Sequence, residues 1–190
     1  MAKPAKRPAT YDDLLKVPEN LVAELIDGEL YTSPRPASRH ARTAGAIYSR
    51  LYRLFDDGDG GPGGWWIVFE PELHLNGDAL VPDVAGWRKE RVPEYPDVPA
   101  WTIAPDWVCE VLSPGTTKFD RLLKLPRYAR EGVEHAWIAE PMTHTIEVHQ
   151  RIEARMELVA VHTGDGAERI VPFDAIALPL DRLWLPMRGA

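Results

Sequence analysis

The feature that most limits the possible folds is an apolar segment, a helical segment and a second apolar segment in direct succession. Residues 106–112 read Asp-Trp-Val-Cys-Glu-Val-Leu and residues 135–140 read His-Ala-Trp-Ile-Ala-Glu, two short apolar runs typical of strands. Between them, residues 118–131 predict a helix closed by Gly132, which suits a helix end because it lacks a Cβ. This order predicts helices packed on a mixed β-sheet with one crossover connection.

Other segments extend this sheet. The three- and four-residue spacing of apolar positions from Ser38 to Phe55 predicts a long amphipathic helix. Residues 65–75 and 79–87 predict two further strands, and 145–150 another after residues 135–140. The expected fold class is therefore α/β, with a mixed sheet flanked by helices.

Turn residues predict a hairpin near each end of the chain. Asp27-Gly28 between two short apolar runs indicates an N-terminal hairpin, because this dipeptide readily adopts positive φ angles. The Gly-Asp-Gly turn at 164–166 indicates a C-terminal hairpin of residues 156–162 and 168–171. A flexible arm is expected over residues 1–9 and a short helix over residues 10–16.

The composition fits one soluble domain over residues 1–190, with 45% hydrophobic and 27% charged residues. The apolar runs are far shorter than the roughly 20 residues of a transmembrane helix, and no signal peptide is recognisable. The single cysteine, Cys109, excludes an internal disulfide framework and a cysteine-cluster zinc site. We expect a cytoplasmic protein without a membrane partner.

The formal net charge of −7 argues against nonspecific coating of nucleic acid, which needs a positive surface. Two segments are nevertheless locally basic: residues 35–53 hold five arginines and no acid, and residues 118–130 hold five basic residues and one acid. Either segment could contact phosphate groups, or could simply be a solvated helix face.

Two acidic residues, Asp83 and Glu110, lie inside apolar strand segments. Period-two alternation gives each of them apolar neighbours on the same face: Val81, Ala85 and Trp87 for Asp83, and Val108 and Leu112 for Glu110. The opposite face of the second segment carries Trp107, Cys109 and Val111. An ionised carboxylate in such a setting needs a cation or takes up a proton, so the two acids together favour a shared divalent metal such as Mg²⁺.

Each acid also has a structural interpretation. Asp83 follows a proline and could form a turn, and Glu110 could pair with an arginine from a helix. A glycosidase-like carboxylate pair also needs two acids, but its mechanism does not call for a nearby cluster of lysine and arginine. Phosphate chemistry does, because its substrate is anionic.

Several motifs appear in a fixed order around these acids. They are Val-Pro-Asp at 81–83, Cys-Glu-Val-Leu-Ser-Pro at 109–114, Lys124, Tyr-Ala-Arg-Glu-Gly-Val at 128–133 and His-Ala-Trp-Ile-Ala-Glu-Pro at 135–141. With Ala-Glu-Leu-Ile-Asp-Gly-Glu-Leu at 23–30, they resemble the Uma-two family of endonucleases, a branch of the PD-(D/E)xK nuclease superfamily. The resemblance covers residues 10–150 and implies a restriction-endonuclease-like fold.

The resemblance implies phosphodiester cleavage that depends on Mg²⁺ or Mn²⁺. Asp83, Glu110 and the backbone carbonyl of Val111 are the implied metal ligands. The superfamily lysine normally stands two residues after the glutamate, where this chain has Leu112. Relatives in the family supply the cation from the following helix, so Lys124 is the expected third catalytic element.

Lys118 is a competing candidate because it lies nearer to the end of the strand. Pro126 bears on the choice, since proline cannot donate to the carbonyl of Leu122 and its ring crowds that turn. The helix could therefore kink and direct Lys124 away from the acids.

Other residues are weaker candidates. His40 could bind phosphate, orient Glu110 or be a buried structural histidine, and Glu24 could extend the acidic site or be solvated. Glu70 and Glu72 are weaker still. The phosphate-binding candidates are Arg39, Arg42 and Arg121. The seven tryptophans could stack on bases, but five of them lie in or beside apolar runs and fit the core or an interface better: Trp65, Trp66, Trp101, Trp107 and Trp137.

Three functions remain open on the sequence alone. The leading one is a Mg²⁺- or Mn²⁺-dependent endonuclease acting on DNA, with a homodimer expected from the resemblance. A catalytically decayed nuclease fold that only binds nucleic acid or a partner is the alternative, suggested by Leu112 and Pro126. Hydrolysis of a non-nucleic phosphodiester is the third.

Overall fold

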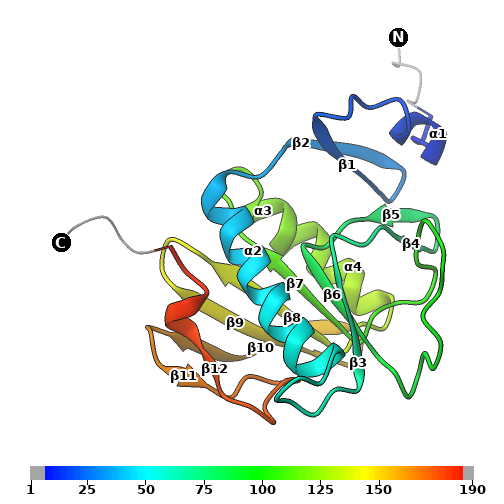
Figure 1. Ribbon diagram of the computed structural model, residues 1–190. Helices are drawn as coiled ribbons and strands as arrows, with labels where there is room; N and C mark the ends of the chain where they lie inside the picture. Colours follow the sequence, from blue (N-terminus) through cyan, green and yellow to red (C-terminus); the bar gives the residue numbers. More distant parts are fainter. Residues whose placement is uncertain (1–6, 186–190) are drawn as a thin grey trace.

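The computed structural model describes residues 7–185, and its main element is a six-stranded sheet in the order β10-β9-β8-β7-β6-β3 (Figure 1). Only β7 and β8 run parallel, and the other neighbours are antiparallel, so the sheet is mixed as expected. Its strands are β3 (Trp65–Phe69), β6 (Val84–Arg88), β7 (Trp107–Val111), β8 (His135–Glu140), β9 (Thr145–Ile152) and β10 (Arg155–Thr163).

The crossover between β7 and β8 is one helical run with a π-helical turn in the middle. It consists of α3 (Thr117–Phe119), the π-turn η2 (Asp120–Lys124) and α4 (Leu125–Arg130). Gly132 follows with a φ of 90°, which confirms its expected role as the helix-ending glycine. Pro126 lies near the start of α4, and in the π-turn before it the Leu125 N–H bonds to the Asp120 carbonyl. The helical run therefore passes through Pro126.

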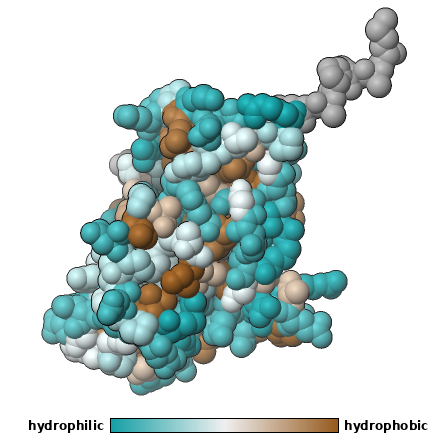
Figure 2. Space-filling model, turned by 90° about the vertical axis from the view of Figure 1, so that its right-hand side faces the viewer, coloured by the Kyte–Doolittle hydropathy of each residue, from teal (hydrophilic) through white to brown (hydrophobic). Residues whose placement is uncertain are grey.

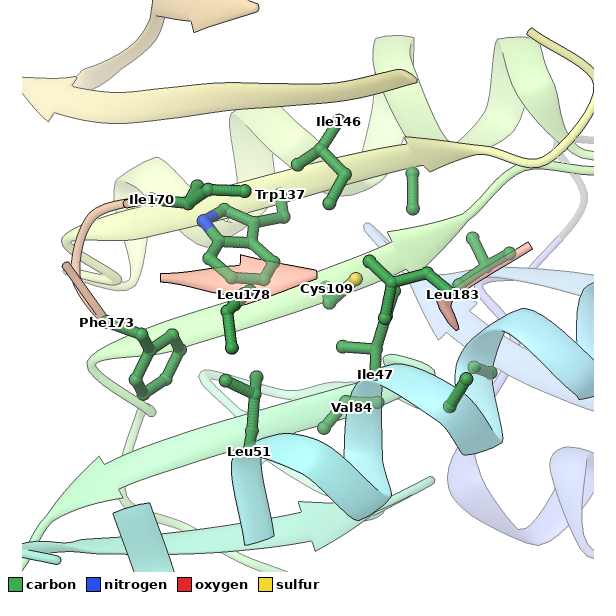
Figure 3. Packing of buried hydrophobic residues seen from close by; sticks show 14 of the residues in the cluster. Ile47, Leu51, Val84, Cys109, Trp137, Ile146, Ile170, Phe173, Leu178 and Leu183 are labelled. Carbon is green, nitrogen blue, oxygen red and sulfur yellow. The ribbon is translucent and has the colours of Figure 1, made fainter. Parts of the chain in front are cut away.

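Helices cover both faces of the sheet (Figure 1). On one face, α2 (Ser38–Leu51) and its π-helical extension η1 (Tyr52–Asp56) pack through Ile47 and Leu51. Figure 3 shows this cluster, which also contains Cys109 and Trp137. On the other face, α4 contributes Leu125 and Tyr128 to a second cluster. Six of the seven tryptophans are buried and Trp66 is half-buried, so the core interpretation of these residues is correct.

A second sheet has the order β2-β1-β5-β4. Its strands are β1 (Leu21–Ile26), β2 (Glu29–Pro34), β4 (Leu73–Leu75) and β5 (Asp78–Leu80), and α1 (Tyr11–Leu14) precedes them. The expected N-terminal hairpin is confirmed: β1 and β2 pair around Asp27 and Gly28, whose φ angles are 51° and 73°.

Two expected strands are each divided between the sheets. Residues 65–75 form β3 and β4, because Glu70 has a φ of 45° and Pro71 follows it. Residues 79–87 lie within β5 and β6, separated at Val81, Pro82 and Asp83. Asp83 therefore lies in the bend before β6 and not inside a strand, which corrects the expectation.

The C-terminal hairpin also differs from the expectation. Residues 156–162 belong to β10, which pairs with β9 through a two-residue turn in which Glu153 has a φ of 56°. Because β9 takes up this pairing, residues 167–168 (β11) pair instead with β12 (Leu178–Pro179), which leads into the 3₁₀ turn η3 (Leu180–Arg182).

Residues 1–6 of the expected arm lie outside the described part of the chain, but residues 7–9 are attached to the fold. Arg7 pairs with Asp13, and the Ala9 N–H donates to the Gly28 carbonyl at 2.7 Å.

Over residues 7–185, no helix is both long and apolar enough to span a membrane. Viewed from the side, hydrophobic residues appear as separate patches among hydrophilic ones (Figure 2).

Candidate functional site

Asp83 and Glu110 lie on neighbouring strands at one end of the larger sheet. β6 and β7 pair with Val84 opposite Cys109, which brings the bend at Asp83 beside Glu110 and Val111. The predicted faces of β7 are confirmed: Val108 and Leu112 belong to the cluster under α4, whereas Trp107, Cys109 and Val111 belong to the cluster under α2. Ala85 and Trp87 share the cluster with Val108 on the side of Glu110, whereas Asp83, in the bend before β6, contacts His40 of α2.

The Asp83 carboxylate is held by two groups. Its Oδ2 accepts a hydrogen bond from the Val111 N–H at 2.7 Å and lies 3.2 Å from Nε2 of His40, in the first turn of α2. Burial lowers the pKa of His40, but the hydrogen bond to Asp83 and the nearby negative charges outweigh it, so the net shift is upward. His40 therefore orients Asp83 and not Glu110, which corrects the sequence-based suggestion.

Glu110 is almost completely buried, with 3% of its surface exposed. Its Oε1 accepts a hydrogen bond from the Tyr128 hydroxyl at 2.5 Å and lies 2.8 Å from Nζ of Lys124. Burial raises the pKa of Glu110 well above its ordinary value, and the charge of Lys124 counteracts this only in part. Glu110 therefore needs a nearby cation to stay ionised.

Lys124 lies at the centre of the site and connects the two sheets. Its Nζ lies 3.0 Å from Oε1 of Glu24 on β1 and donates to the Val81 carbonyl at 2.9 Å, in addition to the contact with Glu110. Burial lowers the pKa of Lys124, but the charges of Glu110 and Glu24 outweigh it and the net shift is upward. The π-turn that precedes Pro126 thus directs Lys124 toward the acids and not away from them.

Glu24 is a buried part of the site and not a solvated hairpin residue. Its exposed fraction is 6%, and its Oε1 accepts a hydrogen bond from the Val81 N–H at 2.9 Å as well as contacting Lys124. The strand β1 brings it there because β1 pairs with β5, which leads directly into the Val81 bend. This geometry agrees with the accessory position suggested for Glu24.

A cavity of about 550 Å³ opens onto these residues. Its lining includes Glu24, His40, Asp83, Glu110 and Lys124, together with Glu70, Glu72 and Asp120. Asp120 is buried, and burial raises its pKa to about 6 although Lys124 and Thr116 oppose the shift.

Sequence reasoning missed Asp120 and Tyr128 as site residues. Tyr128 stands four residues after Lys124, a spacing that places two side chains on one face of an α-helix, so this spacing was an available signal for Tyr128.

Two other predicted residues, Lys118 and Arg121, do not line the cavity, and Leu112 occupies the usual lysine position of the superfamily. Lys118 is exposed and does not line the cavity, whereas Lys124 does. Arg121 forms a two-contact ion pair with Glu147, at 2.6 and 2.9 Å, and its guanidinium is thereby occupied. Leu112, at the usual lysine position of the superfamily, is buried in the apolar cluster under α4.

The donor set fits a hard divalent cation. Oδ1 of Asp83 and Oε2 of Glu110 accept no hydrogen bond from a described residue. In the cavity lining, acidic side chains outnumber the basic ones, which are Arg35, His40 and Lys124. Over residues 7–185 no cluster of three or more His, Cys, Asp or Glu side chains is arranged for a metal, so the fit uses two acids and a backbone carbonyl, with water completing the shell.

A mixed sheet covered by helices, with two acids and a lysine at one end, has the architecture of a nuclease-fold α/β protein. The crystal structure of a protein described as a "putative nuclease belonging to DUF820", from Anabaena variabilis, matches this fold with a TM-score of 0.74 and 22% identity. The match covers 93% of this chain and 97% of that one. A search of curated proteins gives no match.

The family model described as "Uma2: Putative restriction endonuclease" matches residues 8–180. The chain therefore belongs to the Uma2 family, as its motifs indicated.

Proposed function

We propose that this protein is a Mg²⁺- or Mn²⁺-dependent endonuclease that hydrolyses phosphodiester bonds of DNA. The observation that carries the proposal is the arrangement of Asp83, Glu110 and Lys124 around one cavity. The match to the Uma2 family and the likeness to a nuclease fold support the reaction class.

Asp83, Glu110 and the Val111 carbonyl would hold the ion. A divalent ion bound there supplies Lewis acidity and lowers the pKa of a coordinated water. The chain's own residues do the rest of the positioning: Val111 N–H and His40 fix one oxygen of Asp83, which leaves the other for the metal. Tyr128 fixes Glu110 in the same way.

Lys124 offsets negative charge at the site. Its ammonium group is buried and forms ion pairs with two carboxylates, which keep it protonated. It would stabilise the additional negative charge of a phosphate in the transition state. Elsewhere in the superfamily this role belongs to a lysine on the strand. Here Lys124 would fill it from the helical run that follows β7. The position of Leu112 therefore does not by itself remove a catalytic amine from the site.

A homodimer is part of the proposal. β10 is an edge strand of the larger sheet, and its Leu158, Val159 and Val161 are each about half exposed. An exposed apolar edge strand favours pairing with a second chain. Sedimentation equilibrium measures the state directly, and a monomer at all concentrations would remove this part of the proposal.

The test is cleavage of supercoiled plasmid DNA with Mg²⁺, Mn²⁺ or EDTA. Asp83→Asn and Glu110→Gln should each reduce the rate roughly a thousandfold, a loss of about 4 kcal/mol of transition-state stabilisation. Glu90→Gln is the matched control, because Glu90 is an exposed acid in the turn after β6, away from the cavity and from β10, and it should cleave like the wild type. Wild-type cleavage rates in both site variants, or cleavage in EDTA, would contradict the proposal.

The same assay separates the other two functions. A decayed site predicts binding of DNA without cleavage under any metal condition. Hydrolysis of a small phosphodiester predicts turnover of bis(p-nitrophenyl) phosphate, dependent on Asp83, with intact plasmid.

A further inference from the structure

Three arginines lie on one side of α2, at positions 39, 42 and 50. At about 100° per residue they fall within roughly 80° of one another around the helix, and at about 1.5 Å per residue they extend over roughly 17 Å. Arg182, in the 3₁₀ turn η3, lies close enough to Arg50 to affect its charge. Arg182 itself pairs with the neighbouring Asp181 at 3.1 Å. We call Arg39, Arg42, Arg50 and Arg182 the arginine track.

The arginines of α2 lack acidic partners within the described part of the chain. Arg39, Arg42 and Arg50 form no ion pair with a carboxylate of residues 7–185, whereas Arg53 in the next turn pairs with Asp59 at 2.9 Å. Arg50 contacts only the Ala46 carbonyl of its own helix, at 3.4 Å. Nη1 of Arg39 is buried and has no hydrogen-bond partner among residues 7–185. Arg42 is exposed and Arg39 and Arg50 are half-buried, so the solvent-accessible parts of these side chains can contact an external anion.

The cationic groups of the track also repel one another. The pKa of Arg50 lies below its ordinary value because of burial first, and then because of the positive charges of Arg42 and Arg182, with Asp181 opposing them. A cavity of about 500 Å³ adjoins this end of the track, lined by Ser49, Arg50, Arg53, Leu54 and Pro179. The net charge of the chain is −7, but positive charges are concentrated beside this cavity. A bound polyanion would relieve the repulsion between them.

The track begins at the candidate active site. Arg39 directly precedes His40, which contacts Asp83, and α2 then runs along the sheet away from the acids (Figure 1). A rigid helix therefore links the cavity to the basic surface at a fixed distance. The roughly 17 Å of the track corresponds to about five base pairs at about 3.4 Å each.

We propose that the arginine track binds the phosphodiester backbone of the nucleic acid on one side of the scissile bond, over about five nucleotides. This inference rests on the proposed function, because it takes the scissile phosphate to lie beside Asp83 and Glu110. It adds the direction in which the substrate leaves the site and the residues that hold it there. Phosphate contacts of this kind fix register without reading sequence.

The test measures binding without cleavage, by fluorescence anisotropy in EDTA with a 30-base-pair duplex and a 30-nucleotide single strand. Arg42→Gln and Arg50→Gln should each weaken binding at least fivefold and lower the slope of log Kd against log salt by about one. Arg155→Gln is charge-matched and exposed on β10, and should bind like the wild type. Arg50→Lys keeps the charge and should keep the slope, which separates lost charge from lost packing.

Each outcome has a definite meaning. A loss of binding affinity confined to the track variants supports the inference. The probe that shows this loss, duplex or single strand, is the form that the track binds. Equal binding by Arg42→Gln and Arg155→Gln, or no binding of either probe by the wild type, would overturn it. If track-dependent binding occurs but plasmid stays intact with Mg²⁺ and Mn²⁺, the inference holds and the endonuclease proposal fails. If plasmid is cleaved but the track variants bind normally, the reverse is true.

Discussion

At the scale of single residues, the site depends on one buried ammonium group that contacts carboxylates from two sheets. Lys124 lies within 3.0 Å of Glu24 on β1 and 2.8 Å of Glu110 on β7. Removing one partner of a buried ion pair leaves the other charge without compensation, which costs more than the pair itself contributes.

Replacing Lys124 by Met should therefore lower the free energy of unfolding by about 3–5 kcal/mol in EDTA. Added Mn²⁺ should restore part of this stability, because it supplies positive charge to the same carboxylates. Urea denaturation with and without Mn²⁺ measures both effects. Lys118→Met, at an exposed position on the same helical run, should change stability by less than about 0.5 kcal/mol. Equal losses in the two variants would show that Lys124 does not hold the acids together.

Asp120 gives the protein a pH-dependent stability. Its pKa of about 6 lies above the ordinary 3.8, so the folded protein holds this proton more tightly than the unfolded chain does. Stability from this group is present below about pH 4 and is lost as the pH rises to about 6, by about 3 kcal/mol in all. Asp120→Asn removes the titrating group, so its unfolding free energy relative to the wild type should rise by that amount between pH 4 and 7. Denaturation in EDTA across this range checks it, and a constant difference would refute the assignment.

The sequence predicted part of this site for physical reasons that can be named. Alternation along residues 106–112 was enough to place Glu110 on the face with Val108 and Leu112, and the motif resemblance pointed to Lys124. The π-turn at Asp120–Lys124 could not be read, because no local residue type specifies it, and Asp120 was missed with it. The partner of His40 depends on where the bend at Asp83 falls in space.

At the scale of elements, α4 fastens the smaller sheet to the larger one. Arg127 on α4 forms ion pairs with Asp78 at the start of β5 and with Asp27 in the β1–β2 turn. Arg127 and Asp78 are both buried. Because Glu24 stands on the same small sheet, this attachment also holds one of the partners of Lys124 in place.

Arg127→Ala should lower the free energy of unfolding by about 3–5 kcal/mol, since it leaves Asp78 buried without a cation. Hydrogen exchange should become faster in β1 and β5, while the larger sheet keeps its protection. Arg130→Ala removes only a half-exposed contact with Asp27 and should cost at most about 1 kcal/mol. Uniformly faster exchange over both sheets would mean that the two sheets unfold as one unit.

Local sequence patterns predicted the existence of helices and strands well. They predicted the ends of the strands and the pairing between strands less well. The N-terminal hairpin followed from Asp27-Gly28, whose turn conformation is local. Residues 65–75 and 79–87 each looked like one strand, because both halves are apolar and only the backbone turn at Glu70 and the bend at Pro82 separate them. The C-terminal pairing was wrong because β9 competes for residues 156–162, and such long-range competition leaves no mark in a short window.

At the scale of the whole molecule, charge is divided between an acidic cavity and the arginine track. The net charge of −7 conceals this division, since the acids gather around Lys124 and the unpaired arginines follow α2. On the proposed function, a polyanion would lie along the track, and the cavity would need a bound cation to accept a phosphate. The metal is therefore the central element of the account.

The most direct measurement of the central claim is a crystal structure of the protein soaked in Mn²⁺, with the ion located by anomalous scattering. The account predicts one ion that contacts the carboxylates of Asp83 and Glu110, and no ion at that place in Asp83→Asn. Saturating Mn²⁺ with no ion between these two carboxylates, or the same ion in the variant, would contradict it.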